Sequence, residues 1–154
     1  MEHTLDDEHF MRLALAEAQH AFEQDEVPVG AIIVARNQVI ARAHNLCERL
    51  HDFTAHAEMQ AFTAASEYLG GKHLDQCTLY VTLEPCPMCA GAAFWTRVGR
   101  IVFGASDAKR GYQRWNNPAQ HHLIHPKTAV EGGVLEDECS ELLKAFFAQK
   151  RKKP

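Results

Sequence analysis

The chain has 154 residues, 46% of them hydrophobic, and a formal net charge of -4. This size suits one domain with a sizeable core over residues 1–154, while the negative charge excludes a general polyanion binder, and no segment approaches the ~20 apolar residues that span a membrane. Five cysteines, an odd number, and the lack of an apolar stretch at the start argue against secretion and a disulfide framework, so we expect a cytoplasmic protein.

The first third of the chain predicts a helix followed by a β-hairpin. Residues 7–24 place apolar side chains on one helical face, namely Phe10, Leu13, Ala14, Ala18, Ala21 and Phe22. Residues 30–35 and 39–43 are β-rich runs separated by a short polar turn, which is typical of a hairpin.

A second helix is predicted over residues 55–68, with Thr54 as its N-cap and Gly70-Gly71 as its end. The remaining predicted elements are a strand over 78–83, a helix over 87–98, a strand over 100–104, a short strand over 128–132 and a helix over 136–150. The last helix is expected to turn its apolar residues inward, namely Leu142, Leu143, Phe146 and Phe147.

Residues 105–127 are long enough for a crossover that makes the last two strands parallel. The alternation of elements predicts an α/β fold, a three-layer α/β/α sandwich with a central five-stranded mixed sheet. The two motifs described next both fall at strand-to-helix junctions, at the edge of the sheet where ligands bind in open α/β folds.

The motif Pro85-Cys86-Pro87-Met88-Cys89 predicts two metal ligands at the start of a helix. Residues three apart are neighbours on a helix, and a helix N-terminus favours thiolates over thiols. His56 at the start of the preceding helix supplies an imidazole. Three protein ligands leave one zinc position open, as in catalytic sites, where the pKa of bound water falls from about 15.7 to roughly 7.

Glu58 is not needed as a ligand, and we expect it to act as a proton shuttle. A C-x-x-C pair alone also serves redox centres and structural zinc. However, a redox site would leave His56 and Glu58 unused, and a structural site needs a fourth protein ligand. None of the other cysteines has a partner at ligand spacing. The combination of H-x-E with P-C-x-x-C therefore predicts a zinc hydrolase that removes an amino group from a nucleobase, with one zinc per chain.

At these motifs the chain resembles the bacterial tRNA-specific adenosine deaminases, within the cytidine deaminase-like zinc deaminase superfamily. The resemblance covers nearly the whole chain, including Glu26-Val27-Pro28-Val29-Gly30, Thr54-Ala55-His56-Ala57-Glu58, Leu79-Tyr80-Val81-Thr82-Leu83-Glu84-Pro85-Cys86 and Val102-Phe103-Gly104-Ala105. It implies His56, Cys86 and Cys89 as zinc ligands, Glu58 as the proton shuttle, Asn45 as a base contact, Val29 as a lining residue of the base pocket and Asp107 on the RNA side.

The resemblance also implies the substrate and the assembly. The expected reaction converts adenosine to inosine at the wobble position of a tRNA anticodon, and the expected partners are an anticodon stem-loop and a second copy of the chain in a homodimer. Phe94 and Trp95, on the helix that carries the cysteines, offer a surface for that copy; burial against the chain's own sheet is the alternative. The cations available for phosphate contacts are Lys109, Arg110, Arg114 and the basic run 150–153.

Two departures from the family pattern leave alternatives open. Phe53 stands where many relatives have proline. Residues 110–115 interleave aromatic and cationic groups, as single-stranded nucleic-acid surfaces do, although Tyr112 and Trp115 could equally pack against the core. The alternative functions are deamination of a free base, nucleoside or nucleotide, such as guanine or cytosine, and a zinc-stabilised RNA-binding module without turnover.

Overall fold

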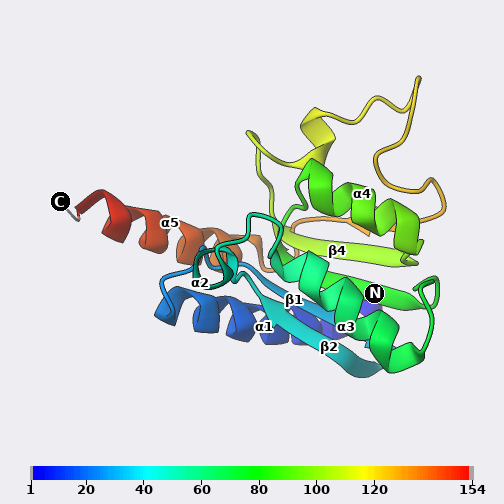
Figure 1. The fold of residues 1–154 in the computed structure, drawn as a ribbon, viewed down its shortest axis with the longest axis horizontal. Coiled ribbons are helices and arrows are strands. Elements are labelled where there is room, and N and C mark those ends of the chain that lie inside the picture. Colours follow the sequence, from blue (N-terminus) through cyan, green and yellow to red (C-terminus); the bar gives the residue numbers. More distant parts are fainter. Residues whose placement is uncertain (1, 153–154) are drawn as a thin grey trace.

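The computed structural model describes the backbone of residues 2–152 and the side chains of residues 6–152. Helices and strands alternate along the chain (Figure 1). In order they are α1 (Glu2–Glu23), β1 (Gly30–Ala35), β2 (Gln38–His44), α2 (Cys47–Leu50), α3 (Ala57–Leu69), β3 (Cys77–Leu83), α4 (Pro87–Thr96), β4 (Arg100–Ala105), the 3-10 turn η1 (Tyr112–Arg114), β5 (Ala129–Glu131) and α5 (Glu136–Lys152). Among the described helices, none is long and apolar enough to cross a membrane.

The five strands form one mixed sheet in the order β2-β1-β3-β4-β5. Strand β1 runs antiparallel to both β2 and β3, whereas β3, β4 and β5 are parallel. The hairpin turn places Arg36 and Asn37 at φ of 51° and 62°, a backbone that matches the twist of the flanking strands. The predicted hairpin, crossover and five-stranded sheet are therefore confirmed.

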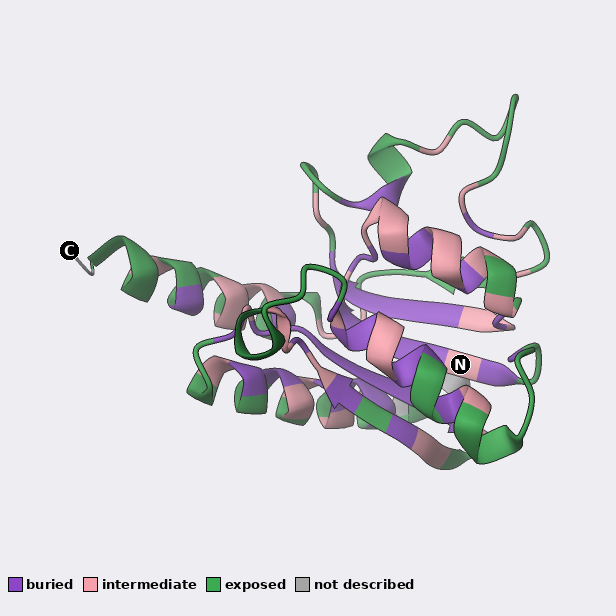
Figure 2. Cartoon of the chain, in the orientation of Figure 1, coloured by how far each residue is buried: buried purple, intermediate pink, exposed green. Residues whose placement is uncertain are grey.

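Two helical layers cover the sheet, each through its own apolar cluster. On one face, α3 and α4 pack alanines and Phe62 against strand residues such as Ile33 and Val81. On the other face, Phe10 and Met11 of α1 and Cys139 of α5 contact the opposite sides of the same strands. Figure 2 shows the central strands buried between these layers. The predicted three-layer α/β/α sandwich is confirmed.

Some details of the prediction are wrong. The short helix α2 and the turn η1 are additional elements, because four or three residues are too few to show a helical period. Phe147 was expected to face inward but its side chain is 44% exposed. Its neighbour Phe146 takes the inward position and packs edge-on against Phe22 of α1, with ring centroids 5.8 Å apart. Adjacent residues on a helix point in different directions, so only one of the two rings can be buried.

A buried ion pair ties α1 to the sheet far from the two motifs. The Arg100 guanidinium donates two hydrogen bonds to Asp7, at 2.8 and 2.7 Å, and the Tyr80 hydroxyl donates a third at 2.8 Å. Asp7 is buried, and its two oxygens are shared between β3 and β4. This contact fixes the position of α1 on its face of the sheet.

Candidate metal centre

Three metal-ligating side chains meet where α3 and α4 begin. The donor atoms of His56, Cys86 and Cys89 all lie within 4.8 Å of one another. Nδ1 of His56 is 3.6 Å from the sulfur of Cys86 and 3.4 Å from that of Cys89. The sequence prediction that these three residues converge is confirmed by this geometry.

Helix starts position all three groups. His56 is the N-cap of α3 and Cys86 the N-cap of α4, both with extended backbones, and Pro87 occupies the first helical positions, where a missing N–H costs nothing. The strand β3 ends at Leu83, so Cys86 follows it after a turn of two residues. The imidazole and the thiols are thus presented at one edge of the sheet by two helices that pack on the same face.

The expected cap of α3 is wrong. Thr54 does not cap the helix, because α3 begins at Ala57 with His56 as its N-cap; Thr54 donates its hydroxyl and its backbone N–H to Asp52, at 2.7 and 2.8 Å. Instead the Ala57 N–H, the first of α3, donates to the side-chain oxygen of Asn45 at 2.8 Å. A residue distant in sequence therefore satisfies the helix terminus and fixes the orientation of the ligand-bearing turn.

The protonation of the two thiols is coupled. Hydrogen bonding from Cys89 lowers the pKa of Cys86 to about 4, and the contact with His56 acts in the same direction. The same hydrogen bond, together with burial, raises the pKa of Cys89. Hydrogen bonding to Cys86 also raises the pKa of His56. These opposite shifts favour one thiolate beside one thiol, and a divalent cation would displace the remaining thiol proton.

Glu58 lies beside the cluster without joining it. Its side chain is only 4% exposed, and burial raises its pKa to about 7. The carboxyl group is in hydrogen-bond contact with Cys89 but is not one of the three clustered donors. A carboxyl group whose pKa lies near neutrality can both accept and donate a proton in one reaction cycle.

The three expected substrate contacts surround this centre in different ways. The Asn45 N–H donates to the Val29 carbonyl at 3.1 Å, which places both residues beside the start of α3. Asn45 is buried, and because its side-chain oxygen accepts the Ala57 N–H, its amide nitrogen is the side-chain group left to donate to a bound molecule. Asp107 accepts hydrogen bonds from Lys109 and Arg110, at 3.1 and 3.0 Å, and so shapes its own loop.

Two buried carboxylates that the sequence analysis did not single out organise the loops at this edge. Glu84 accepts the N–H groups of Asp107 and Gln113, at 3.0 and 3.1 Å, and so docks the crossover loop beside Cys86. Glu26 accepts the N–H groups of Glu48 and Arg49, at 2.9 and 2.8 Å, and so fixes α2. For Glu84 the available signal was a lone carboxylate after an apolar strand, whereas Glu26 follows the polar residues 23–25 and gave no such signal.

In the loop that begins with Arg110, one aromatic residue packs against the core and the other is available to a nucleic acid. Tyr112 is buried in the core, and its N–H donates to the Pro85 carbonyl at 2.8 Å. Trp115 is exposed, with the Arg114 guanidinium 5.4 Å from its ring centroid. One aromatic group therefore packs the crossover against the core and the other faces solvent.

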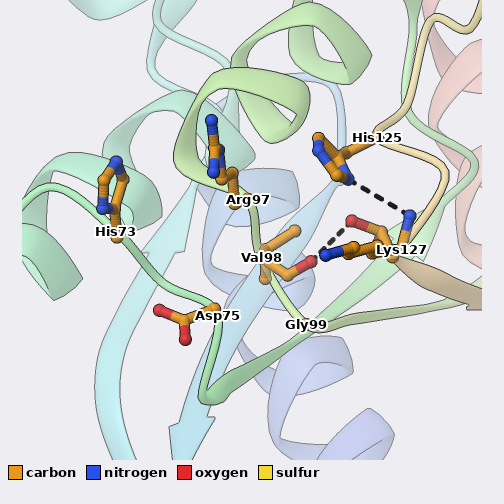
Figure 3. A pocket seen from close by; sticks show the side chains of 8 residues that line it. His73, Asp75, Arg97, Val98, Gly99, His125 and Lys127 are labelled. Carbon is orange, nitrogen blue, oxygen red and sulfur yellow. Dashed lines mark hydrogen bonds between the residues drawn. The ribbon is translucent and has the colours of Figure 1, made fainter.

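A cavity of about 510 Å³ lies away from the metal centre (Figure 3). Arg97, one of its lining residues, is the C-cap of α4, whereas Cys86 is the N-cap, and the 10 residues of the helix between them span ~15 Å. The cavity is lined by His73, Asp75, Arg97, Val98, Gly99, His125, Lys127 and Thr128. It lies at the opposite end of α4 and contributes nothing to the His56 cluster.

The chain was compared with known families and proteins. Residues 5–151 match the family model described as MafB19-like deaminase. The tRNA-specific adenosine deaminase of Bacillus subtilis is 48% identical over 96% of this chain and 92% of its own length, and that of Aquifex aeolicus is 45% identical over 94% and 95%.

Two solved structures are similar in fold. A structure from a study of tRNA:A34 deaminases, which edit adenosine to inosine at the wobble position, has a TM-score of 0.78 and 44% identity over 87% of this chain and 98% of its own. A guanine deaminase from Nitrosomonas europaea has a TM-score of 0.79 and 25% identity over 92% and 84%. The chain therefore belongs to the MafB19-like deaminase family and, within it, to the tRNA-specific adenosine deaminases.

Proposed function

We propose that this chain is a zinc-dependent hydrolase that converts adenosine to inosine at the wobble position of a tRNA anticodon. The observation that carries the proposal is the cluster of His56, Cys86 and Cys89 within 4.8 Å, beside the buried Glu58. The 48% identity to a tRNA-specific adenosine deaminase supports the choice of substrate.

The donor set fits one zinc ion per chain. One imidazole and two thiols are typical zinc ligands, and a set of three leaves a position for a reacting molecule. His56, Cys86 and Cys89 would hold the ion. When bound, zinc acts as a Lewis acid that makes water nucleophilic near neutral pH.

The chain's own groups handle protons and position the base. Glu58 accepts a proton from the attacking water and passes it to the adenine ring nitrogen. It then accepts the remaining proton of the added hydroxyl and passes it to the amino group, which departs as ammonia while the water oxygen remains on the ring. The Asn45 amide nitrogen, beside the start of α3, would donate to the base. Val29 is hydrogen-bonded to Asn45 through the backbone, and its apolar side chain would line the base pocket.

The proposed RNA partner requires local positive charge on an acidic chain. The crossover loop carries three exposed cations, which we call the crossover cations: Lys109, Arg110 and Arg114. They follow Asp107, whose backbone N–H is held by Glu84 and which we place on the RNA side. In the basic run 150–153, Lys150 is paired with Asp25 at 2.6 Å, while Lys153 lies outside the described residues. We place the first phosphate contacts on the crossover cations.

We also propose a homodimer in the cytoplasm. Trp95 on α4 is 79% exposed, so burial against the chain's own sheet is not its role. A symmetric dimer would bury it on the helix that carries both cysteines, and twofold dimers are the commonest closed assembly.

The substrate assignment is tested by comparing turnover of an anticodon stem-loop with turnover of free adenosine, cytidine and guanine. We expect inosine at the wobble adenosine and little conversion of the free compounds. Conversion of guanine without conversion of the stem-loop would overturn the proposal. It would favour a free-base deaminase, such as the guanine deaminase whose fold this chain resembles.

The metal assignment is tested by elemental analysis and turnover of matched variants. Cys86→Ala, Cys89→Ala and His56→Ala should each lose zinc and activity. Glu58→Ala should keep zinc and fold but lose turnover by about 10²- to 10⁴-fold or more, because acid–base catalysis typically contributes that much. Zinc loss in Glu58→Ala would make this residue a ligand, and active zinc-bound Cys86→Ala would contradict the cluster's role.

A further inference from the structure

Phe53 has the most exposed side chain among the large hydrophobic residues of the described part, at 92%. Burying a phenylalanine ring stabilises a protein, and the exposed Phe53 ring does not contribute this stabilisation in the free chain. The ring therefore offers almost its whole surface to a molecule outside the chain.

The loop that carries Phe53 is fixed rather than loose. Besides the Glu26 carboxylate that holds α2, the Asp52 N–H donates to the Cys47 carbonyl at 3.0 Å, and Asp52 in turn accepts two hydrogen bonds from Thr54. The Cys47 thiol donates to the carbonyl of Phe53 itself at 3.9 Å. Because contacts on both sides anchor the backbone, the ring is held outward at a defined place.

That place adjoins the metal centre. Phe53 precedes His56 by three residues, so their Cα atoms are at most about 11 Å apart. The Leu46 N–H donates to the Ala55 carbonyl at 3.0 Å, which closes the loop directly before the ligand. Figure 1 shows the segment between α2 and α3 at the edge of the sheet where α3 and α4 begin. Arg49, which is exposed, adds one cationic group to the same loop beside the carboxylates of Glu48 and Asp52.

The chemistry of the reaction calls for such a surface. An enzyme that acts on the amino group of a base must take that base out of its stack, and the adjoining nucleotides then lose a stacking partner. Aromatic side chains next to cations replace that partner on single-stranded nucleic acids, because every base has a face on which a ring can stack.

We propose that Phe53 is a stacking platform for the base of a nucleotide that adjoins the deaminated adenosine; this inference rests on the proposed function. The ring touches substrate but takes no part in proton transfer. The exposed Arg49 of the same loop would contact the backbone of that nucleotide. Phe53 therefore acts on RNA affinity and on kcat/KM, and not on zinc binding.

The test compares binding and deamination of an anticodon stem-loop by Phe53→Ala, Phe53→Trp and the control Tyr68→Ala, which removes another exposed ring at the far end of α3. Loss of one stacked base should weaken binding and kcat/KM by about 5- to 150-fold in Phe53→Ala. Phe53→Trp should retain the wild-type values, because it keeps an aromatic face, and Tyr68→Ala should do the same. Zinc content should be equal in all four proteins.

Stem-loops that lack the base on the 5′ or the 3′ side of the adenosine identify the stacked nucleotide. With one of these two RNAs, wild type should bind as weakly as Phe53→Ala, since the partner of the ring is gone. Equal affinity of wild type and Phe53→Ala for the intact RNA would overturn the inference. It would also be overturned if Phe53→Ala bound both altered RNAs more weakly than wild type does. A change of oligomeric state in Phe53→Ala by sedimentation would instead assign the ring to a contact between copies.

The same measurements separate this inference from the proposed function. Wild-type protein that contains zinc but forms no inosine in any stem-loop would refute the proposed function and this inference with it. Wild-type protein that forms inosine, with Phe53→Ala equally active, would refute the stacking platform alone.

Discussion

Replacing Glu84 with glutamine tests how the crossover loop is held beside the metal centre. The buried Glu84 carboxylate accepts two backbone N–H groups, from Asp107 and Gln113. A glutamine side chain has one acceptor oxygen, so it can hold only one of them, and its NH2 group faces the other donor.

The expected magnitude follows from these two hydrogen bonds. A hydrogen bond to a charged group contributes about 1.5–3 kcal/mol and a neutral one about 0.5–1.5 kcal/mol. Losing one bond and weakening the other should therefore destabilise the protein by about 3 kcal/mol. For a chain of this size each kcal/mol shifts the melting temperature by roughly 2–4 °C, so we expect Glu84→Gln to lower it by about 6–12 °C.

Thermal unfolding and hydrogen exchange measure this effect at two levels. The amides of Asp107 and Gln113 should exchange faster in Glu84→Gln, and RNA turnover should fall while zinc stays bound. Gly111→Ala provides the reciprocal test, since a Cβ at Gly111 would collide with the Glu84 carboxylate. Unchanged protection of both amides, with an unchanged melting temperature, would refute the claim that Glu84 anchors the loop.

Three further predictions concern stability, assembly and charge. Arg100→Gln should cost about 3–5 kcal/mol in urea unfolding because it removes the guanidinium that donates two hydrogen bonds to the buried Asp7. Arg12→Gln, which removes an exposed pair with Glu138, should cost less than about 1 kcal/mol; equal costs would contradict this. Trp95→Glu should convert the proposed dimer into a monomer in sedimentation, and a dimer that survives would place the interface elsewhere. Neutralising all three crossover cations should reduce the salt slope of RNA binding by about 2, at roughly 0.7 per phosphate; an unchanged slope would remove them from the RNA surface.

The sequence anticipated that His56, Cys86 and Cys89 come together, because the determinants of this arrangement are local. The spacing of Cys86 and Cys89, and the helix starts at Cys86 and His56, depend on residues within a few positions of each side chain. The hairpin and the parallel pairing of the last two strands followed from the lengths of the connections. These features are fixed by helix geometry and chain reach, and both can be read without knowing the tertiary contacts.

What the sequence did not predict depends on partners far along the chain. The first N–H of α3 is held by Asn45 rather than by Thr54, because the helix begins two residues later than a Thr54 cap requires. Glu26 accepts the N–H of Glu48, 22 residues further along the chain, and Glu84 accepts the N–H of Asp107, 23 residues further along. Such contacts arise only when the layers have packed, so no local pattern indicates them.

We propose that the His56, Cys86 and Cys89 cluster, with Glu58, removes the amino group of a wobble adenosine by hydrolysis. The most direct test is mass analysis of an anticodon stem-loop after incubation with zinc-loaded protein in water labelled with heavy oxygen. We predict that the wobble adenosine becomes inosine carrying one heavy oxygen atom, and that Glu58→Ala with full zinc content forms almost none. Inosine without the label, or equal conversion by the Glu58→Ala variant, would contradict the account.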